Sequence, residues 1–403
     1  MRNFNATYLV TIFLVALKTL GGFAFSWFLI YTLGDKLHVK ILKDLSAIIG
    51  ISLFIRFGAD AVILKLATKL YVEKNKTYLN YLLCFSFIIC MVNSIVTLLF
   101  VDKFIKFETL EVKSAIFIAL AISLTFCLMS FLKAFKRVNH SFFGDTGMIM
   151  VLSFPFLFIN NGNVIVTLGY IWLFVMAISL FLILRIIKNE CKENSVNDFS
   201  TLLFNFIMPL PNLFLNSVLN YLQQWGIIYL SALSLNVIYA SSFILIIRAS
   251  YIFNAVLSPL ASYTVPEVIR LFDCGGAHKA NIYIKKTKEL YQYASFICLV
   301  ISSAFSIWSI YPNLVDFYYI SAFMIFLFCC SFSVASGPVN MYMAVLGYEK
   351  LLIKIRLALL IPFVILLYCT SGNLFILVCS IYIFSQRFFL VVFLKKKTGI
   401  IAL

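Results

Sequence analysis

Three basic residues lie deep within long apolar runs of the sequence: Lys18, Arg56 and Arg248. A charged side chain at the centre of a bilayer costs about 3 kcal/mol or more, so each needs a partner or a water-filled cavity. Arginine suits phosphate because its planar fork bonds two oxygens at once, and lysine adds a point charge. We therefore expect a cationic cavity that receives an anionic group such as a pyrophosphate.

A purely structural interpretation of the same residues is also open. Asp60 follows Arg56 by four residues on one helix face, so the two could pair, while Lys18 and Arg248 could bond backbone carbonyls. We favour the cavity, because one acidic group cannot neutralise three cations and no other carboxylate lies deep in an apolar run. Asp60 is then also a candidate carrier of a coupling proton or sodium ion.

Two further sites carry polar side chains inside apolar runs. Gln223, Gln224 and Trp225 could contact a sugar through amide hydrogen bonds and ring stacking, or could serve as polar contacts between helices. Arg387 lies seven residues, about 10 Å of helix, before Leu394. We expect its side chain to extend toward the lipid headgroups as an anchor.

The composition excludes an ordinary soluble enzyme. Of 403 residues, 63% are hydrophobic and only 12% are charged, about half the usual charge. The net charge of +16 comes from basic residues scattered singly, which argues against a nucleic-acid partner. The three histidines are far apart and the ten cysteines form no C-x-x-C pair, so we expect neither a metal site nor a cofactor.

Twelve apolar runs are long enough to cross a bilayer as helices. The first is too long for a signal peptide and lacks an A-x-A-like exit. Most of the 32 basic residues fall in alternate loops, which predicts that both termini lie in the cytoplasm. The runs cover 8–33, 41–66, 78–101, 114–135, 144–160, 164–187, 202–233, 236–266, 291–311, 314–346, 351–371 and 373–394.

A polar interval at 187–201 divides the runs into six and six. It predicts an all-α integral membrane protein of two six-helix lobes around a central cavity, with an N-terminal lobe at 1–190 and a C-terminal lobe at 200–403.

Four segments carry a resemblance to a known family. In order and spacing on the twelve runs, they make the whole chain resemble the Wzx-type O-antigen and polysaccharide flippases of the multidrug/oligosaccharidyl-lipid/polysaccharide (MOP) exporter superfamily. The family's acidic residue in the seventh span is replaced here by Gln223, Gln224 and Trp225. The segments are RFGADAVILK at 56–65, YASSF at 239–243 with the following Arg248, Pro259 with VPE at 265–267, and MAVLGYEK at 343–350.

The resemblance implies a MATE-like fold and a transporter rather than an enzyme. Such a flippase moves a polyprenyl-pyrophosphate-linked oligosaccharide, the repeat unit of an O-antigen, capsule or exopolysaccharide, from the inner to the outer leaflet of the bacterial cytoplasmic membrane. It implies alternating access, with membrane lipids and the glycan polymerase machinery as further partners. The family's basic cavity residues map by position only onto Lys18, Arg56 and Arg248.

Two alternatives belong to other functional classes. The first is a MATE-like drug or metabolite exporter, although cavities for cationic drugs favour acidic residues and the buried balance here is positive. The second is an integral-membrane polysaccharide polymerase, which would be expected to carry catalytic residues on a long outer loop. The predicted outer loops of this chain are all short.

Overall fold

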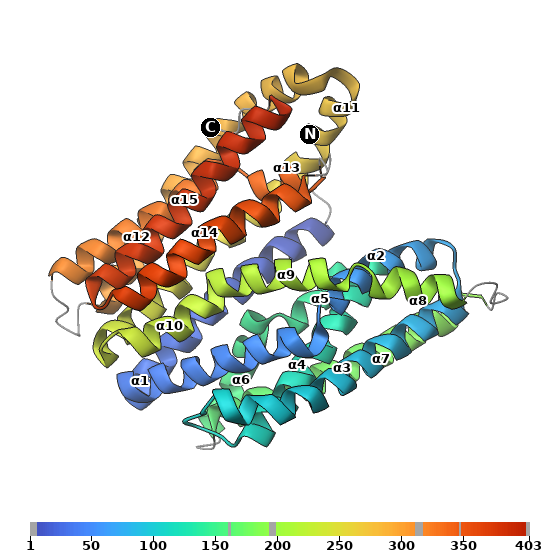
Figure 1. The fold of residues 1–403 in the computed structure, drawn as a ribbon, viewed down its shortest axis with the longest axis horizontal. Helices are drawn as coiled ribbons and strands as arrows, with labels where there is room; N and C mark the ends of the chain where they lie inside the picture. The colour runs from blue at the N-terminus through green and yellow to red at the C-terminus, as the bar shows by residue number, and fades with distance from the viewer. Residues whose placement is uncertain (1–5, 160–162, 193–198, 311–316, 346–347, 400–403) are drawn as a thin grey trace. The chain divides into compact units, whose positions relative to one another are not determined.

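The computed structural model describes residues 6–159, 163–192, 199–310, 317–345 and 348–399. Over these residues the chain is almost entirely helical, and its only β-type pairing is an isolated bridge between Asn75 and Lys192. The helices form two compact units (Figure 1). Unit 1 comprises Met1–Phe25 and Lys40–Tyr229, and unit 2 comprises Ser26–Val39 and Leu230–Leu403. The predicted all-α class is confirmed, whereas the lobe boundaries at 190 and 200 stay a prediction.

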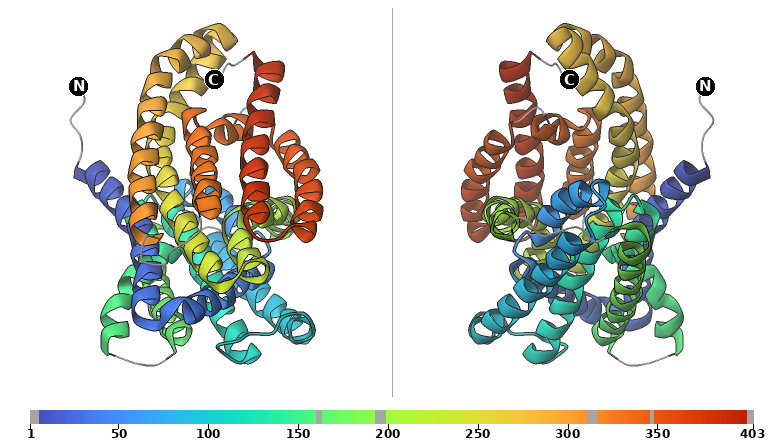
Figure 2. Two further views of the ribbon diagram at one scale, coloured as in Figure 1. Left: turned by 90° about the vertical axis from the view of Figure 1, so that its left-hand side faces the viewer. Right: turned by 90° about the vertical axis from the view of Figure 1, so that its right-hand side faces the viewer.

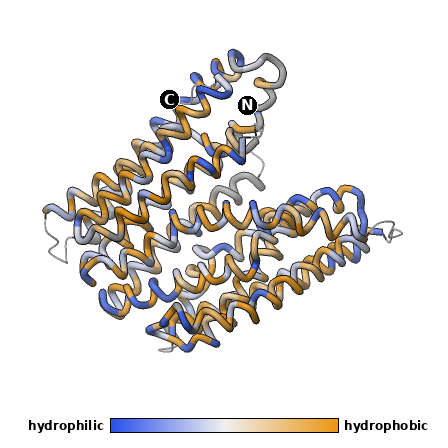
Figure 3. Tube along the Cα trace, viewed as in Figure 1, coloured by the Kyte–Doolittle hydropathy of each residue, from blue (hydrophilic) through white to orange (hydrophobic). Residues whose placement is uncertain are grey.

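The helices have the apolar character of a multi-pass membrane protein. Within the described residues, nine helical segments are long and apolar enough to span a bilayer. Hydrophobic residues make up most of the helical length, and hydrophilic residues are more frequent toward the helix ends (Figure 3). Where the structure describes them, the twelve predicted runs fall largely on helix.

Unit 1 is built around α4, which is apolar on every side and therefore buried. It packs against α2, α3 and α7. The first ten helices are α1 (Ala6–Arg56), α2 (Ala59–Val72), α3 (Lys76–Phe104), α4 (Val112–Ala134), α5 (Val138–Ser141), α6 (Thr146–Ile159), α7 (Val164–Glu190), α8 (Phe199–Ile207), α9 (Leu210–Tyr221) and α10 (Ile227–Ser234), with a π-helical turn at Leu222–Gly226 before α10.

Helix α1 contains two predicted runs. Its apolar stretch Phe13–Arg56 has 44 residues, which as one straight helix would be about 66 Å long, twice the hydrocarbon core. Gly34, at φ 77° and ψ 168°, is not helical and separates the two runs.

The continuous helix predicted for 41–66 is wrong. The chain breaks between α1 and α2, where Phe57 and Gly58 have φ values of 46° and 80°. A Cβ at Gly58 would lie 2.7 Å from the backbone nitrogen of Phe214 and 2.9 Å from the carbonyl oxygen of Leu210. Glycine is therefore needed both for the left-handed conformation and for the close approach of α9.

At the other end of this second run, Asp44 fixes the loop between α3 and α4. Its Oδ2 accepts hydrogen bonds from the Thr109 backbone N–H at 2.7 Å, from the Thr109 hydroxyl at 2.7 Å and from the Glu108 N–H at 2.9 Å. The Glu108 carboxylate in turn binds Lys43 at 2.6 Å and Lys40 at 3.1 Å. The loop is thus held by charge-assisted contacts to α1.

These contacts predict a pH-dependent loop. Hydrogen bonds from Lys43 and Lys40 lower the pKa of Glu108, so the stabilisation is present above the ordinary glutamate pKa and is lost as pH falls through the lowered value. We expect amide hydrogen exchange at 105–111 to accelerate on acidification below about pH 4.3 beyond its intrinsic pH dependence. Glu108→Gln should remove this step while leaving the Asp44 contacts in place. An unchanged pH profile in that variant would contradict the assignment.

Unit 2 contains α11 (Val237–Ile310), α12 (Phe317–Ala335), α13 (Val339–Val345), α14 (Glu349–Cys369) and α15 (Asn373–Thr398). Helix α11 folds back on itself, as Figure 2 shows. Thr264 and Tyr291 would be about 40 Å apart in a straight helix, yet their hydroxyl oxygens lie 2.5 Å apart. Gly276, at φ 63°, lies between them. The two limbs carry the runs predicted at 236–266 and 291–311.

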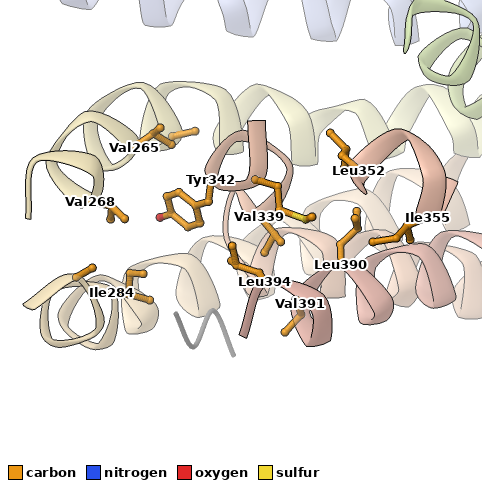
Figure 4. Close-up of a cluster of buried hydrophobic side chains, with 13 residues drawn as sticks. Val265, Val268, Ile284, Val339, Tyr342, Leu352, Ile355, Leu390, Val391 and Leu394 are labelled. Atoms are coloured by element: carbon orange, nitrogen blue, oxygen red, sulfur yellow. The ribbon is translucent and has the colours of Figure 1, made fainter. Parts of the chain in front are cut away.

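The apolar core beside this bend joins four helices (Figure 4). Val265 and Val268 lie on one limb of α11 and Ile284 on the other. Tyr342 from α13 and Leu394 from α15 belong to the same cluster, to which α14 also contributes. All five are at most 7% exposed. Burial of this surface holds the bend closed.

The anchoring role predicted for Arg387 is wrong. Its side chain is buried, and it donates from Nε to the Ser336 hydroxyl at 2.6 Å and from Nη2 to the Ser333 carbonyl at 2.8 Å. Helix α12 ends at Ala335 and therefore leaves carbonyl groups without helical partners. Arg387 binds these groups instead of extending to the headgroups.

Candidate functional site

Lys18 is paired with a carboxylate that the sequence reasoning missed. Its Nζ lies 3.0 Å from Oδ2 of Asp145, just before α6, and 5.3 Å from the Phe142 ring centre. Helix α6 approaches α1 closely here, since a Cβ at Gly147 would be 2.0 Å from the Lys18 carbonyl oxygen. In the sequence analysis Asp60 is the one acidic group available to the three cations, and Asp145 is a second. The sequence feature that could have indicated Asp145 is an aspartate at the start of a helix. Its Oδ1 accepts a hydrogen bond from the Gly147 N–H at 3.1 Å.

Arg56 and Asp60 form the pair that the structural interpretation of the sequence offered as the alternative, with Nε and Oδ2 3.4 Å apart. The break at Phe57 and Gly58 lies between them. Arg56 is in the last turn of α1 and Asp60 in the first turn of α2, so each charge lies at the helix end whose dipole favours it.

The Arg56 guanidinium keeps unused hydrogen-bonding capacity. It lies 4.3 Å from the centre of the Phe126 ring on α4, and the residue is 8% exposed. Among the described residues, its Nε and Nη1 have no hydrogen-bond partner, because the contact with Asp60 is electrostatic only. Buried N–H groups without acceptors are costly, and a phosphate oxygen would satisfy them well.

Lys133 adds a third cation to the group formed by Lys18 and Arg56. It lies two turns after Phe126, on the same face of α4, and within electrostatic range of both ion pairs. Sequence reasoning missed it because at the end of its apolar run it resembles an ordinary flanking charge. We call this group the unit 1 charge cluster, and its members are Lys18, Arg56, Asp60, Lys133 and Asp145.

Arg248 lies on α11 in unit 2, where it is 2% exposed and stacks 5.5 Å from the ring centre of Tyr251. On the same face two turns earlier, the Ser241 hydroxyl lies 2.9 Å from Nδ1 of the fully buried His38. This contact ties the Ser26–Val39 segment to α11 within unit 2. The convergence of Arg248 with the unit 1 cations stays a prediction.

Gln223, Gln224 and Trp225 form the centre of the π-helical turn at Leu222–Gly226. The Trp225 side chain is 7% exposed, and its carbonyl accepts the Ser46 hydroxyl at 2.5 Å. Gln224 is exposed and Gln223 is half-buried. A sugar contact therefore remains a prediction, with Gln224 as the most accessible of the three. Single π-turns occur frequently at functional sites.

An apolar pocket of about 640 Å³ adjoins the break beside Arg56. Phe57 itself is part of its wall, and Asn93 donates to the Ile55 carbonyl at 3.0 Å, which fixes the end of α1 at the pocket. The polar atoms of the wall come from few side chains. The lining residues are Ala47, Gly50, Ile51, Phe54, Phe57, Asn93, Val96, Thr97, Phe100, Val101, Ile105, Tyr221 and Tyr229.

The helices and their apolar surfaces define a multi-pass α-helical membrane protein. No protein-family model and no curated protein matches the sequence.

Solved structures show that the fold is MATE-like. One is an inward-facing conformation of a multidrug resistance MATE transporter of the MOP superfamily, with a TM-score of 0.64, 13% identity and coverage of 96% of this chain and 94% of that one. An outward-facing conformation of such a transporter has a TM-score of 0.62 and 15% identity, and the match covers 98% of this chain and 95% of that one. A MATE protein in complex with MaL6 has a TM-score of 0.62 and 14% identity, with coverage of 98% of this chain and 95% of that one. The predicted fold is confirmed.

Proposed function

We propose that this protein is a lipid-linked oligosaccharide flippase of the MOP superfamily. It moves a polyprenyl-pyrophosphate-linked repeat unit from the inner to the outer leaflet of a bacterial cytoplasmic membrane by alternating access. The fold supports this mechanism, because solved structures of the same fold include inward-facing and outward-facing conformations. The protein breaks no bond; it replaces the water around the phosphates, whose charge could not cross hydrocarbon unaided.

The observation that carries the proposal is the surroundings of Arg56. In the part of the chain that the structure describes, its guanidinium has N–H groups without acceptors, within a cluster of three cations and two carboxylates. The adjoining Phe57 lines an apolar pocket of about 640 Å³. A cationic site next to an apolar pocket matches a substrate with a diphosphate joined to a prenyl chain.

A MATE-like exporter of drugs or metabolites is the second candidate. Asp60 and Asp145 favour it, since carboxylates are suited to cationic substrates and to a coupling proton or sodium ion. Each of them already has a cation within 3.4 Å. The described cluster therefore retains an excess of positive charge, which supports an anionic substrate.

The test begins with deletion in the native host. We expect lipid-linked oligosaccharide to accumulate on the inner leaflet, and the wild-type gene to restore glycan at the cell surface. Arg248→Met should abolish the rescue, whereas Arg248→Lys should retain part of it, because lysine keeps the charge but loses the bidentate fork. Lys65→Ala, which removes an exposed lysine of α2, is the control and should rescue fully at equal protein abundance.

Two results would reject this function. Wild-type surface glycan with Arg248→Met, Arg56→Ala and Lys18→Ala alike would remove the role of the cations. Export of cationic dyes that depends on Asp60 and Asp145, with no change in lipid-linked glycan on deletion, would instead support the drug exporter.

A further inference from the structure

A second pocket, of about 580 Å³, lies where the turn from α2 into α3 meets the ends of α4 and α7. A neighbouring hollow of about 340 Å³ shares Asn189 and Glu190 with it. The charge distribution predicts this end of unit 1 to be cytoplasmic. We call the two hollows together the basic pocket. Its described lining contains five bases, Lys74, Lys136, Arg137, Arg185 and Lys192, against the single carboxylate of Glu190.

Backbone and side-chain contacts hold the walls of the basic pocket. The Lys192 N–H donates to the Lys74 carbonyl at 2.9 Å, and the Lys76 N–H donates to the Lys192 carbonyl at 3.0 Å. The Tyr71 ring packs on Phe135 with ring centres 4.8 Å apart. These contacts join the chain after α7 to the chain after α2, so the lysines surround a formed cavity.

Glu190 offsets only one of the five bases of the described lining. Its carboxylate accepts the Tyr71 hydroxyl, which raises the pKa of Tyr71 to about 12. Its other oxygen lies 3.4 Å from Nη2 of Arg137. With that carboxylate paired to Arg137, the other four bases leave the described lining of the pocket positive.

Two of these bases occupy positions that favour glycine. Lys74 and Lys136 have φ values of 53° and 58°. Each follows a helix end closed by the double hydrogen bond of a Schellman motif, from Lys74 N and Asn75 N after α2 and from Lys136 N and Arg137 N after α4.

A lysine in this left-handed position is strained, whereas glycine would not be. The helix dipoles do not explain why lysine stands at these two positions, because Lys69 and Lys133 already place a base in the last turn of α2 and α4. Both strained lysines line the same cavity.

We propose that the basic pocket binds a phosphate-bearing anion, with the headgroup of an anionic phospholipid as its natural source. Basic pockets between membrane helices at the cytoplasmic surface suit such headgroups. Lysine supplies point charges and arginine a bidentate fork for the phosphate oxygens. This site does not depend on the proposed transport function, since none of its residues belongs to the unit 1 charge cluster.

The test uses the purified full chain in a neutral detergent and measures its melting temperature. We expect micellar short-chain phosphatidylglycerol to raise it, and phosphatidylcholine of the same chain length to leave it unchanged. In a Lys74→Gly/Lys136→Gly variant, phosphatidylglycerol should bind about thirtyfold more weakly, the loss expected for two basic contacts. Without ligand this variant should melt no lower than wild type, because glycine relieves the left-handed strain.

Inorganic phosphate in a parallel series distinguishes the sources. A response to phosphatidylglycerol alone assigns a lipid headgroup, and a response to phosphate as well assigns a free phosphate group; both support the site. Lys65→Ala removes a lysine of α2 outside the pocket and should respond as wild type does. If the glycine variant folds poorly, Arg185→Gln, a change at an exposed position of α7, replaces it. The proposal is overturned if neither probe acts on wild type, or if the pocket variants respond like wild type.

Discussion

Gly58→Ala should be among the most damaging single substitutions in unit 1. The new Cβ would lie 2.7 Å from the Phe214 nitrogen and 2.9 Å from the Leu210 carbonyl oxygen, and these are backbone atoms that cannot rotate away. Left-handed strain at φ 80° adds to the clash. We expect a loss of about 3 kcal/mol or more in the free energy of unfolding, measured by equilibrium unfolding in mixed detergent micelles.

Gly276→Ala is the matched control. Gly276 has a similar φ of 63°, but no atom of the described residues lies within 4 Å of its Cβ position. The Gly276→Ala variant should therefore have the conformational strain without the clash, and it should lose about 1 kcal/mol in the free energy of unfolding. Equal losses for the two variants would mean that the approach of α9 to Gly58 does not limit this position.

The second large effect concerns the Arg56–Asp60 pair. Arg56→Ala leaves the half-buried Asp60 carboxylate, whose side chain is 20% exposed, without its cation. We expect it to cost about 3 kcal/mol of stability, the lower end of the range for a broken buried pair. The double variant Arg56→Ala/Asp60→Ala removes both charges and should recover most of that loss. Transport of lipid-linked glycan should be absent in both, because neither carries the guanidinium. Unfolding free energies and surface glycan, compared at equal protein abundance, measure the two outcomes separately.

This cycle separates structure from substrate binding. If the double variant restores both stability and transport, Arg56 serves only to neutralise Asp60. The pair Lys18–Asp145, with atoms 3.0 Å apart and both side chains more than a quarter exposed, is the comparison. Lys18→Ala and Asp145→Ala should each lose less free energy of unfolding than Arg56→Ala, since exposed charges are partly stabilised by water.

The sequence predicts the helices well because continuous apolarity and length suffice for that purpose. It also predicts the contact between Arg56 and Asp60, which depends only on a four-residue spacing. The break between them could not be predicted, because Phe57 is an unusual residue for a left-handed conformation and the glycine is required by α9, some 150 residues later. Such approaches depend on tertiary packing.

Other misses have the same origin. The contact between Lys18 and Asp145 could not be predicted from the sequence, because the two residues are 127 positions apart. Arg387 could equally reach headgroups or the open end of α12 by length alone, and only the position of Ser336 decides between them. Individual apolar runs were therefore predictable, whereas the partners of their buried charges were not.

The interruption at Phe57 and Gly58 has a consequence for how an anion could be exchanged. Asp60 lies among the free amide groups at the start of α2, and Arg56 among the terminal carbonyls of α1. Each ion thus keeps a polar neighbour of its own when the two part. For the flippase proposed above, an arriving diphosphate would take the place of the carboxylate beside the guanidinium. On its departure the contact between Arg56 and Asp60 would re-form, so the site would need no second ligand to return to its empty state.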